Sequence, residues 1–340
     1  MFFRRLRLTI LVITFLSIPV FCSVFISPDE WYIAGIVSLT IPAFTLLVAG
    51  ALIYFILCRS RWAILPAIIL CSALPLFSTS FSFIRDDQQF AAPLYVVTHN
   101  MNALEFYIKR PKFDSNRQAF QTWIAKNNFD IICLQEMIEG KKAPFLIPGY
   151  YKASSSKHTN LGDHLGLFIF SRYPIIRSGK MEFAFNSYNR LMWVDLAMGK
   201  DTLRVINVHL TSYDLRSYSI RGNLRKVRAA IRARTWYARL IHRFVERSPY
   251  PVILCGDFNE TPVSYPYRKI NSLLTDAFAG SGAGFQYSFR FLGFPIRIDH
   301  IFTSPSLRAK DYQVMHGVPW SDHAPVSARI GVGESVIGDR

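Results

Sequence analysis

The sequence has few cysteines and few acidic residues, and both shortages exclude classes of protein. Only five of its 340 residues are cysteine, and their spacings match neither a zinc site nor a disulfide framework. We therefore expect the cysteines to be buried small apolar side chains. The chain also lacks internal repeats, and a hydrophobic content of 51% excludes a disordered protein.

Basic residues outnumber acidic ones by 39 to 23, which gives a formal net charge of +16. Only six of the 39 basic and four of the 23 acidic residues lie in the segment that ends at Ala91, so 33 basic and 19 acidic residues follow it. This balance favours an anionic partner, such as nucleic acid, a phosphorylated substrate or a phospholipid surface. The segment after Ala91 is long enough for one large domain or two small ones.

The N-terminal part contains long runs without charge. We predict three transmembrane helices, at about residues 8–26, 31–58 and 62–83, because each run has the roughly 20 apolar residues needed to cross a bilayer. A cleaved signal peptide is an alternative for the first run, but no clear cleavage site follows it and two more apolar runs do. Buried core helices are a second alternative, which the lack of an amphipathic pattern disfavours. Residues 1–83 are therefore predicted to form a membrane region.

Basic residues around these runs predict the orientation. Three arginines precede the first run and two lie between the second and the third, whereas the loop after the first run has none. Lys and Arg accumulate on the cytoplasmic side, so both basic segments should face the cytoplasm. We predict an integral protein of the bacterial inner membrane, with the rest of the chain on the extracytoplasmic side. The arginines are Arg4, Arg5, Arg7, Arg59 and Arg61.

After a polar linker at residues 84–91, residues 92–333 have the pattern of an α/β domain, followed by a tail at 334–340. Short runs rich in β-branched and aromatic residues predict strands, and helices are expected near 116–127, 222–247 and 267–274. Many strands with few interposed helices favour a sandwich of mixed sheets over a doubly wound parallel sheet. The predicted strands are LYVVTHN, DIICLQE, HLGLFIFS, LMWVDLAM, TLRVINVHL, PVILCGDFN, RIDHIFTS and APVSARIGV.

Polar side chains recur at the ends of these strands. One carboxylate at a strand end is usually a turn residue or a helix cap, but a whole set containing Asn, Glu, Asp and His is typical of an active site. Carboxylate and amide oxygens bind hard divalent cations, and histidine moves protons near neutral pH. Because no Cys or His cluster has zinc spacing, we expect Mg²⁺ or Mn²⁺. The set is Asn100, Glu136, His209, Asp257, Asn259, Asp299, Asp322 and His323.

The order of the motifs resembles that of the endonuclease/exonuclease/phosphatase superfamily. The motifs are THNMN, LQE, GLFIFSRYPI, NVHL, GDFNETP, RIDHIF and SDHAPV. The resemblance covers essentially residues 92–333 and implies a four-layer sandwich of two mixed β-sheets flanked by helices. Members include nucleases, sphingomyelinases, inositol phosphatases and deadenylases, so the resemblance implies metal-dependent hydrolysis of phosphate esters.

The resemblance also implies which residues contact the metal and the substrate. Asn100 and Glu136 would hold the metal, with Asp322 as an additional ligand, and the metal would stabilise charge on the phosphoryl group. Arg190, in SYNRLMW, matches a position where family members often contact phosphate; a surface arginine is the alternative.

The remaining residues would move protons and bind phosphate. By resemblance, Asp257 would orient or deprotonate the attacking water, Asn259 would hydrogen-bond that water or the phosphate, and His209 would donate to a phosphate oxygen. Asp299 would fix the tautomer of His323, which would transfer a proton or stabilise the transition state. The sequence leaves open whether Asp257 or His323 is the general base.

These features predict a membrane-anchored, divalent-metal-dependent phosphoesterase in which water attacks phosphorus. The substrate would be a phosphodiester or phosphomonoester of a lipid, a nucleotide or a nucleic acid. One alternative is a nuclease that acts on extracytoplasmic DNA or RNA. Another is a non-catalytic binding domain on a membrane stalk, which would predict the loss of site residues, and none is missing. The membrane is an expected partner, and no obligate protein partner is inferred.

The predicted helix at 222–247 has a basic stripe beside its apolar one. Steps of three, four and seven residues place the arginines on a single helix face. A solvated basic face and attraction to anionic headgroups or polyanions both fit this pattern. The arginines are Arg221, Arg225, Arg228, Arg232, Arg239 and Arg243.

The predicted orientation can be tested with a topology reporter. Alkaline phosphatase fused after Phe83 should be active in a bacterial host, because the basic residues place this point outside the cytoplasm. A silent phosphatase together with an active cytoplasmic reporter at the same point would contradict the orientation.

Overall fold

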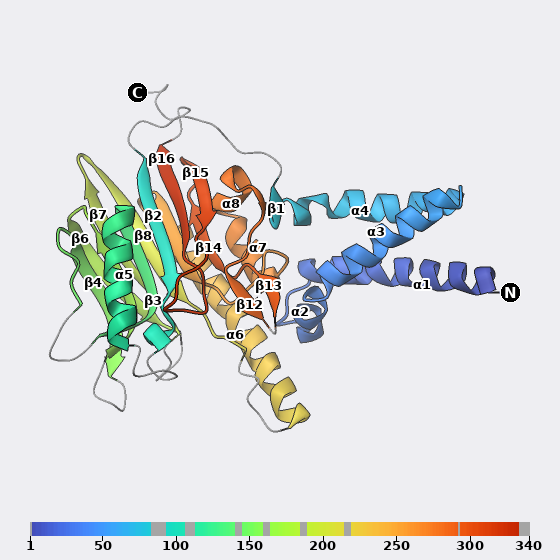
Figure 1. Cartoon of the computed structure of the whole chain (residues 1–340), viewed down its shortest axis with the longest axis horizontal. Coiled ribbons are helices and arrows are strands. Elements are labelled where there is room, and N and C mark those ends of the chain that lie inside the picture. The colour runs from blue at the N-terminus through green and yellow to red at the C-terminus, as the bar shows by residue number, and fades with distance from the viewer. Residues whose placement is uncertain are drawn as a thin grey trace.

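The computed structural model describes residues 2–82, 93–105, 113–139, 145–158, 164–183, 189–213, 219–291 and 293–332. The predicted linker at 84–91, the tail at 334–340 and Phe83 lie outside these residues. A helical N-terminal region extends from one side of a β-sandwich (Figure 1).

Two six-stranded mixed sheets pack face to face at the centre of the C-terminal domain (Figure 1). Strand β2 is parallel to β3 and β8 is parallel to β9, whereas the other pairs are antiparallel. The first sheet has the order β10 (Thr275–Asp276), β14 (Asp299–Thr303), β9 (Val252–Asp257), β8 (Asp201–His209), β7 (Arg190–Met198) and β6 (Ile175–Glu182). The second has the order β15 (Leu307–Val314), β16 (Val326–Val332), β2 (Leu94–Asn100), β3 (Ile131–Glu139), β5 (His164–Ser171) and β4 (Tyr151–His158).

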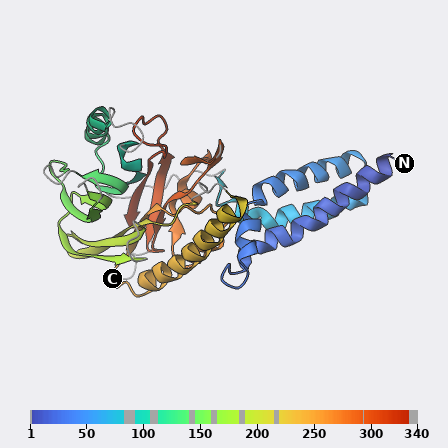
Figure 2. The ribbon, with the colours of Figure 1, turned by 90° about the horizontal axis from the view of Figure 1, so that it is seen from below.

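Helices cover the outer face of each sheet, so the domain has four layers (Figure 2). Helix α5 (Phe113–Asn127) packs on the second sheet through Phe120 and Ile124. Helices α6 (Ile220–Glu246) and α7 (Tyr265–Asn271) pack on the first sheet. Strand β9 is buried along its whole length because it is covered on both faces, which explains its continuous apolar run. The predicted two-sheet α/β architecture flanked by helices is confirmed.

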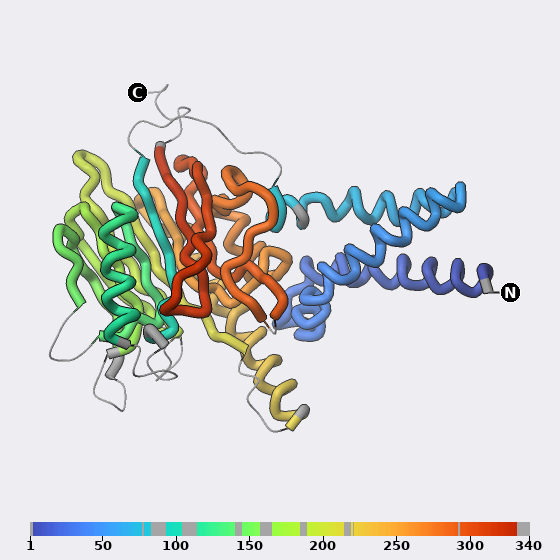
Figure 3. The backbone as a smooth tube through the Cα atoms, in the orientation of Figure 1, coloured from blue at the N-terminus to red at the C-terminus, as the bar shows by residue number. Residues whose placement is uncertain are grey.

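Short elements lie on the side of the sandwich from which the N-terminal helices leave (Figure 3). Strand β1 (Phe81–Ser82) pairs with β11 (Gly284–Phe285), and β12 (Phe289–Phe291) forms a hairpin with β13 (Phe294–Ile296). Helix α8 (Ala277–Ser281), which follows β10, also lies on this side. The short helix η3 (Asn102–Glu105) follows β2 and lies elsewhere, against β3 and α5.

The N-terminal region is a bundle of apolar helices. Helix α1 packs on α3, and α3 packs on α4, around a core that includes Val20, Val48 and Ile69. The elements are α1 (Phe2–Cys22), η1 (Ser23–Phe25), α2 (Tyr32–Ser38), α3 (Ile41–Leu57), η2 (Arg61–Ala63) and α4 (Ile64–Phe77).

The structure does not support three full transmembrane helices. Among the described residues, one helix, Phe3–Phe25, is by itself long and apolar enough to cross a membrane, and a signal sequence would have the same properties. The second predicted span is divided into α2 and α3, which meet at an angle of 55°. Pro42 explains the break, because it has no N–H to donate to the Ser38 carbonyl.

The third predicted span is too short in the structure. Its apolar helix covers Arg61–Leu76, and the chain then turns toward the sandwich. Phe81 and Ser82 pair with Phe285 and Gly284 in a β-ladder. The last residues of this apolar run therefore belong to the C-terminal domain rather than to a helix.

Candidate active site

A row of polar side chains crosses one end of the first sheet. Arg190 of β7 pairs in register with His209 of β8, His209 with Asp257 of β9, and Asp257 with Asp299 of β14. Residues directly opposite each other on adjacent strands project from the same face of a sheet. A hydrogen bond from Asn100 to Asp257 shows that this face is turned toward the second sheet.

The second sheet brings its own polar residues to the same edge. Strand β2 ends at Asn100, which is paired with Gln135 of β3, and β3 continues to Glu139. The pairing of β3 with β5 shifts between Leu134 and Met137, which is a β-bulge, and Glu136 in this bulge has φ of 47°. Left-handed backbone is uncommon for glutamate, and such strain is concentrated at functional sites. The bulge takes Glu136 out of the strand alternation and places it beside Asn100.

Four of the predicted site residues meet where the two sheets end. Asn100 Nδ2 donates to Asp257 Oδ2 at 2.9 Å and to Glu136 Oε1 at 3.3 Å. His209 Nε2 lies 3.3 Å from Glu136 Oε1 and 3.8 Å from Asp257 Oδ2. The Asn100 oxygen accepts the Asn102 N–H at 2.9 Å, so Asn100 acts here as a donor between two carboxylates. A metal-ligand role for Asn100 stays a prediction.

A buried ion pair forms the second part of the site. His323 Nδ1 lies 2.9 Å from Asp299 Oδ2, and the Phe289 ring lies 4.6 Å from the His323 ring. Burial lowers the pKa of His323, but Asp299 and other carboxylates outweigh it and raise this pKa to about 10. Burial likewise raises the pKa of Asp299, but His323 overrides it and lowers this pKa. His323 is therefore cationic at neutral pH.

The pKa of Asp257 shifts in the opposite direction from that of Asp299. Burial, followed by repulsion from Asp299, raises the pKa of Asp257 to about 6. The backbone N–H of Asn259 donates to Asp257 Oδ1 at 2.8 Å, and the Asn259 side chain donates to the Leu210 carbonyl at 3.0 Å. Asn259 therefore positions Asp257 through its backbone, and a direct contact of its side chain with phosphate stays a prediction.

The two remaining predicted residues have different surroundings. Asp322 is exposed at the site, and its pKa is raised by desolvation and by repulsion from Glu136 and Asp299. Arg190 is fully buried, and its Nη1 donates to the Ser155 carbonyl at 3.0 Å, across to the second sheet. The alternative of a surface arginine is thus wrong, and a phosphate contact by Arg190 stays a prediction.

The donor set fits a hard divalent cation. Ligand atoms of Asp257, Asp299 and His323 lie within 4.8 Å of one another, a group that differs from the predicted ligand set. His323 Nδ1 and Asp299 Oδ2 already contact each other at 2.9 Å, so a cation fits better on the side of Glu136, whose side chain is 32% exposed, and Asp322. Asp299 Oδ1 is buried without a hydrogen-bond partner among the described residues, so this oxygen has a lone pair available for a further ligand.

Sequence reasoning missed the residues that join the two sheets behind the site. Gln135 Nε2 donates to Asn207 Oδ1 at 2.6 Å and to Thr98 Oγ1 at 2.9 Å. Asn207 Nδ2 donates to two backbone carbonyls of the second sheet at 2.9 and 3.0 Å. The available signal was an amide in an apolar strand just before a site residue, as Gln135 precedes Glu136 and Asn207 precedes His209.

A second missed group fixes the loop after β9. Arg297 Nη1 donates to Asp276 Oδ2 and lies near His300 Nδ1, both at 2.8 Å, and His300 Nε2 lies 2.8 Å from the Glu260 carbonyl. Burial and the Arg297 charge lower the pKa of His300 to about 4, so the ring is neutral and its Nε2–H donates to Glu260. The signal was an arginine and a histidine within the otherwise apolar segment PIRIDHIF, beside the predicted site residue Asp299.

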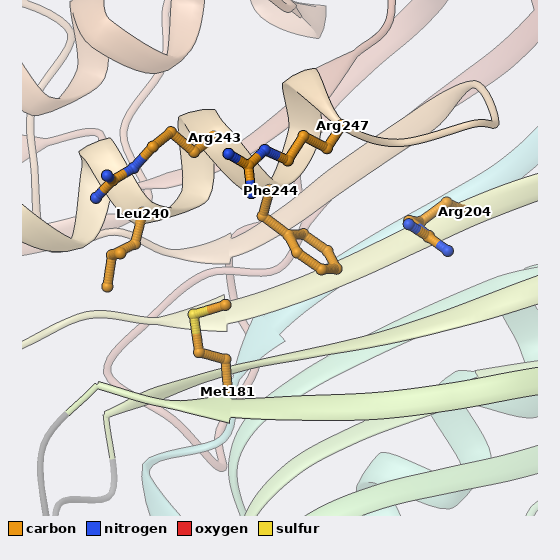
Figure 4. Close-up of a pocket in the computed structure, with 6 residues that line it drawn as sticks. All are labelled: Met181, Arg204, Leu240, Arg243, Phe244 and Arg247. Atoms are coloured by element: carbon orange, nitrogen blue, oxygen red, sulfur yellow. The ribbon is translucent and has the colours of Figure 1, made fainter.

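A cavity of about 480 Å³ lies elsewhere, between the C-terminal half of α6 and the first sheet (Figure 4). Its lining residues include no carboxylate and no histidine, and Arg204 is held by Asp195 through contacts of 2.7 and 2.9 Å. The cavity therefore lacks groups for acid–base chemistry. It is lined by Met181, Arg204, Leu240, Arg243, Phe244 and Arg247.

Solved structures with this fold are similar to the C-terminal domain. Humanized TDP2 of D. rerio has a TM-score of 0.56 and 16% identity, with 71% of this chain and 100% of that chain covered. The human Nocturnin catalytic domain has a TM-score of 0.54 and 17% identity, with 76% and 99% covered. The mannosyl-6-phosphatase Bt3783 of Bacteroides thetaiotaomicron has a TM-score of 0.50 and 19% identity, with 70% and 99% covered.

Comparison of sequences gives a family for each part of the chain. No curated protein sequence matches the chain. Residues 2–80 match a family described as a domain of unknown function, DUF8431. Residues 97–323 match the endonuclease/exonuclease/phosphatase family, and this range runs from just before Asn100 to His323 and so contains every predicted site residue. Because the second match covers more than half of the sequence, the chain belongs to the endonuclease/exonuclease/phosphatase family of phosphate-ester hydrolases.

Proposed function

We propose that this protein is a membrane-anchored, divalent-metal-dependent phosphoesterase that hydrolyses a phosphodiester or phosphomonoester by attack of water on phosphorus. The observation that carries the proposal is the meeting of Glu136, Asp257 and the Asp299–His323 pair at the shared edge of two sheets. Together these groups supply a metal ligand, a base and a fixed cation.

Asp257 is the better candidate for the general base. With a pKa of about 6 it is ionised at neutral pH, yet it is basic enough to accept a proton from water. His323 is already protonated, so it stabilises negative charge on the phosphoryl group or donates to the leaving oxygen. Asp299 keeps the imidazole in one orientation. A Mg²⁺ or Mn²⁺ ion held by Glu136 and Asp322 would supply further stabilisation of phosphoryl charge.

The substrate class is a choice between lipid, nucleotide and nucleic acid phosphate esters. A nuclease activity is the second candidate, because D. rerio TDP2, a structure with the same fold, has been solved with a single-stranded DNA product. A panel of these three substrate classes with the full chain and Mg²⁺ or Mn²⁺ separates the candidates. Hydrolysis of none of them would overturn all three substrate candidates.

The helical bundle supports membrane anchoring. Large apolar side chains on its helices are exposed, including Leu46, Leu57 and Ile64, and such surface is costly in water. Arg7 Nη2 donates to Ser60 Oγ at 2.7 Å, so the basic N-terminus and the basic turn after α3 lie at the same end of the bundle. This arrangement fits an extracytoplasmic enzyme domain in the bacterial inner membrane.

Removal of the metal ligand should abolish activity without unfolding the domain. We expect Glu136→Ala to lower kcat/KM for an aryl phosphodiester by about 100-fold or more, since metal binding contributes several kcal/mol. Excess EDTA should have the same effect on the wild type. Glu246→Ala, which removes an exposed carboxylate at the end of α6, is the matched control. Wild-type rates in EDTA, or in folded Glu136→Ala judged by circular dichroism, would refute the site.

The pH profile should report the protonation of Asp257 and His323. The base must be ionised, so kcat/KM should rise with pH through about 6, the pKa of Asp257. His323 must stay protonated to stabilise negative charge, so kcat/KM should fall as the pH rises through about 10, the pKa of His323. The acid limb should disappear in the residual activity of Asp257→Asn. A rate that falls between pH 5 and 8 would reverse the assignment of base and cation.

Asp299 and His323 should act as one unit. Asp299→Asn and His323→Ala should each reduce kcat/KM by roughly 10²–10⁴, because a positioned acid–base group is lost. The double variant should lie near the worse single variant, since each residue depends on the other. Independent, multiplying losses at saturating Mg²⁺ would contradict the coupling. Near-wild-type single variants would remove both residues from the chemistry.

A further inference from the structure

The N-terminal half of α6 presents a basic surface. Arg221, Arg225, Arg228 and Arg232 are all exposed and share a helix face, because they are spaced by three or four residues. In the sequence of α6 the first acidic residue is Glu246, at the opposite end of the helix. The positive charge of this face is therefore uncompensated within the helix.

This basic face is the one that contacts the base of the bundle. The Arg228 guanidinium lies 4.5 Å from the centre of the Tyr32 ring in α2. Further along the same face, Arg239 donates to Asp29 at 2.5 Å and to Ser27 at 2.7 Å. Figure 2 shows α6 along the outer side of the sandwich with one end beside the base of the bundle. The face is thus turned toward the side from which the apolar helices leave.

Aromatic and apolar side chains flank these arginines. Trp236 is 46% exposed and Leu224 is 56% exposed on α6, and Trp31, just before α2, is 47% exposed. Exposed tryptophan is typical of the zone between water and the bilayer interior. Arginine binds phosphate with paired hydrogen bonds. Basic and aromatic side chains at the base of an apolar bundle match the chemistry of a phospholipid headgroup layer.

We propose that the surface formed by Arg221, Arg225, Arg232, Trp236 and the adjoining α2 binds anionic phospholipid headgroups of the membrane that holds the bundle. The inference rests on the proposed membrane anchoring. Lipid is favoured over nucleic acid because the basic face contacts the base of the apolar bundle and carries exposed tryptophan.

This contact would restrict the orientation of the domain relative to the bilayer. The N-terminal half of α6 projects past the edge of the sandwich where β2 ends, which is the edge that holds the active site (Figure 1). With this half of α6 on the headgroups, the domain would be held at the membrane at a second place besides the bundle itself, which restricts its rotation relative to the bilayer.

Trp236 provides a local reporter for the test. The full chain is reconstituted in phosphatidylcholine proteoliposomes that contain either brominated phosphatidylcholine or brominated phosphatidylglycerol, and tryptophan quenching is measured. The Trp236 contribution is the difference from Trp236→Phe. We expect stronger quenching of Trp236 by brominated phosphatidylglycerol, and loss of this preference at high salt.

Removing the charge of two arginines on this surface tests whether they bind the anionic headgroups. Arg225→Gln/Arg232→Gln should lower the preference for phosphatidylglycerol by about 30-fold, since each of the two basic residues near an anionic surface contributes about 1 kcal/mol. The matched control is Arg243→Gln/Arg247→Gln, which removes two exposed arginines at the other end of the helix and should keep the preference. An equal loss in both variants, or no loss in either, would overturn the proposal.

Two further readouts separate this inference from the proposals on which it rests. Trp62 lies at the far end of the bundle, so quenching that is lost in Trp62→Phe reports insertion of the helices. Quenching of Trp62 without quenching of Trp236 would overturn only the lipid surface, and quenching of neither would overturn the anchoring as well.

Hydrolysis of the aryl phosphodiester in the same vesicles reports catalysis independently. Binding of a labelled single-stranded oligonucleotide through Arg225 and Arg232, without a lipid preference, would assign the surface to nucleic acid.

Discussion

The hydrogen-bonded bridge between Gln135 and Asn207 is the contact on which the site depends. Glu136 and Asn100 belong to one sheet, whereas His209, Asp257 and Asp299 belong to the other, so no single sheet contains the site. The bridge links the sheets one residue before Glu136 and two before His209. Leaving a buried amide unsatisfied costs about 1–3 kcal/mol, so any sliding of one sheet on the other that breaks the bridge is opposed. The relative position of the two half-sites is therefore fixed by the core beneath them.

The packing of the two sheets also determines the protonation of the carboxylates at the active-site edge. Asp257 and Asp299 are cross-strand partners in the buried interior, where two ionised carboxylates repel each other strongly. The pair responds asymmetrically, because Asp299 has His323 as a direct partner and Asp257 has mainly neutral donors. Their pKa values therefore move apart, Asp257 upward and Asp299 downward. Two identical side chains thus acquire different proton affinities from their positions.

The bundle is joined to the enzyme domain at several points, so its orientation relative to the site is defined. Strand β1 continues the chain from α4 into a ladder with β11, and Arg239 pairs with Asp29. Arg297 Nη2 donates to the Thr79 carbonyl just after α4 at 2.5 Å. Arg297 also lies near His300, whose neighbour Asp299 orients His323. The attachment of the helices and the framework of the active site therefore share one buried arginine.

The sequence by itself determined eight of the twelve strands in the two large sheets, the amphipathic α6 and the order of the motifs, because these depend on local patterns of apolar and polar residues. It did not predict β4, β6, β10 and β15. Its motifs also named residues that the structure brings together at one edge, because strand ends in a layered fold gather there, and the roles of these residues stay predictions. Three features of the site could not be predicted from the sequence, because each depends on a neighbour from another strand. They are the higher pKa of Asp257 relative to Asp299, the hydrogen bond that the Asn100 amide donates to Asp257, and the burial of Arg190. The apolar run at 62–83 likewise gave no sign that Phe81 and Ser82 pair with residues 284–285, because hydropathy does not distinguish a membrane helix from a buried ladder. Local composition sets which elements form, and only long-range packing decides what each side chain faces.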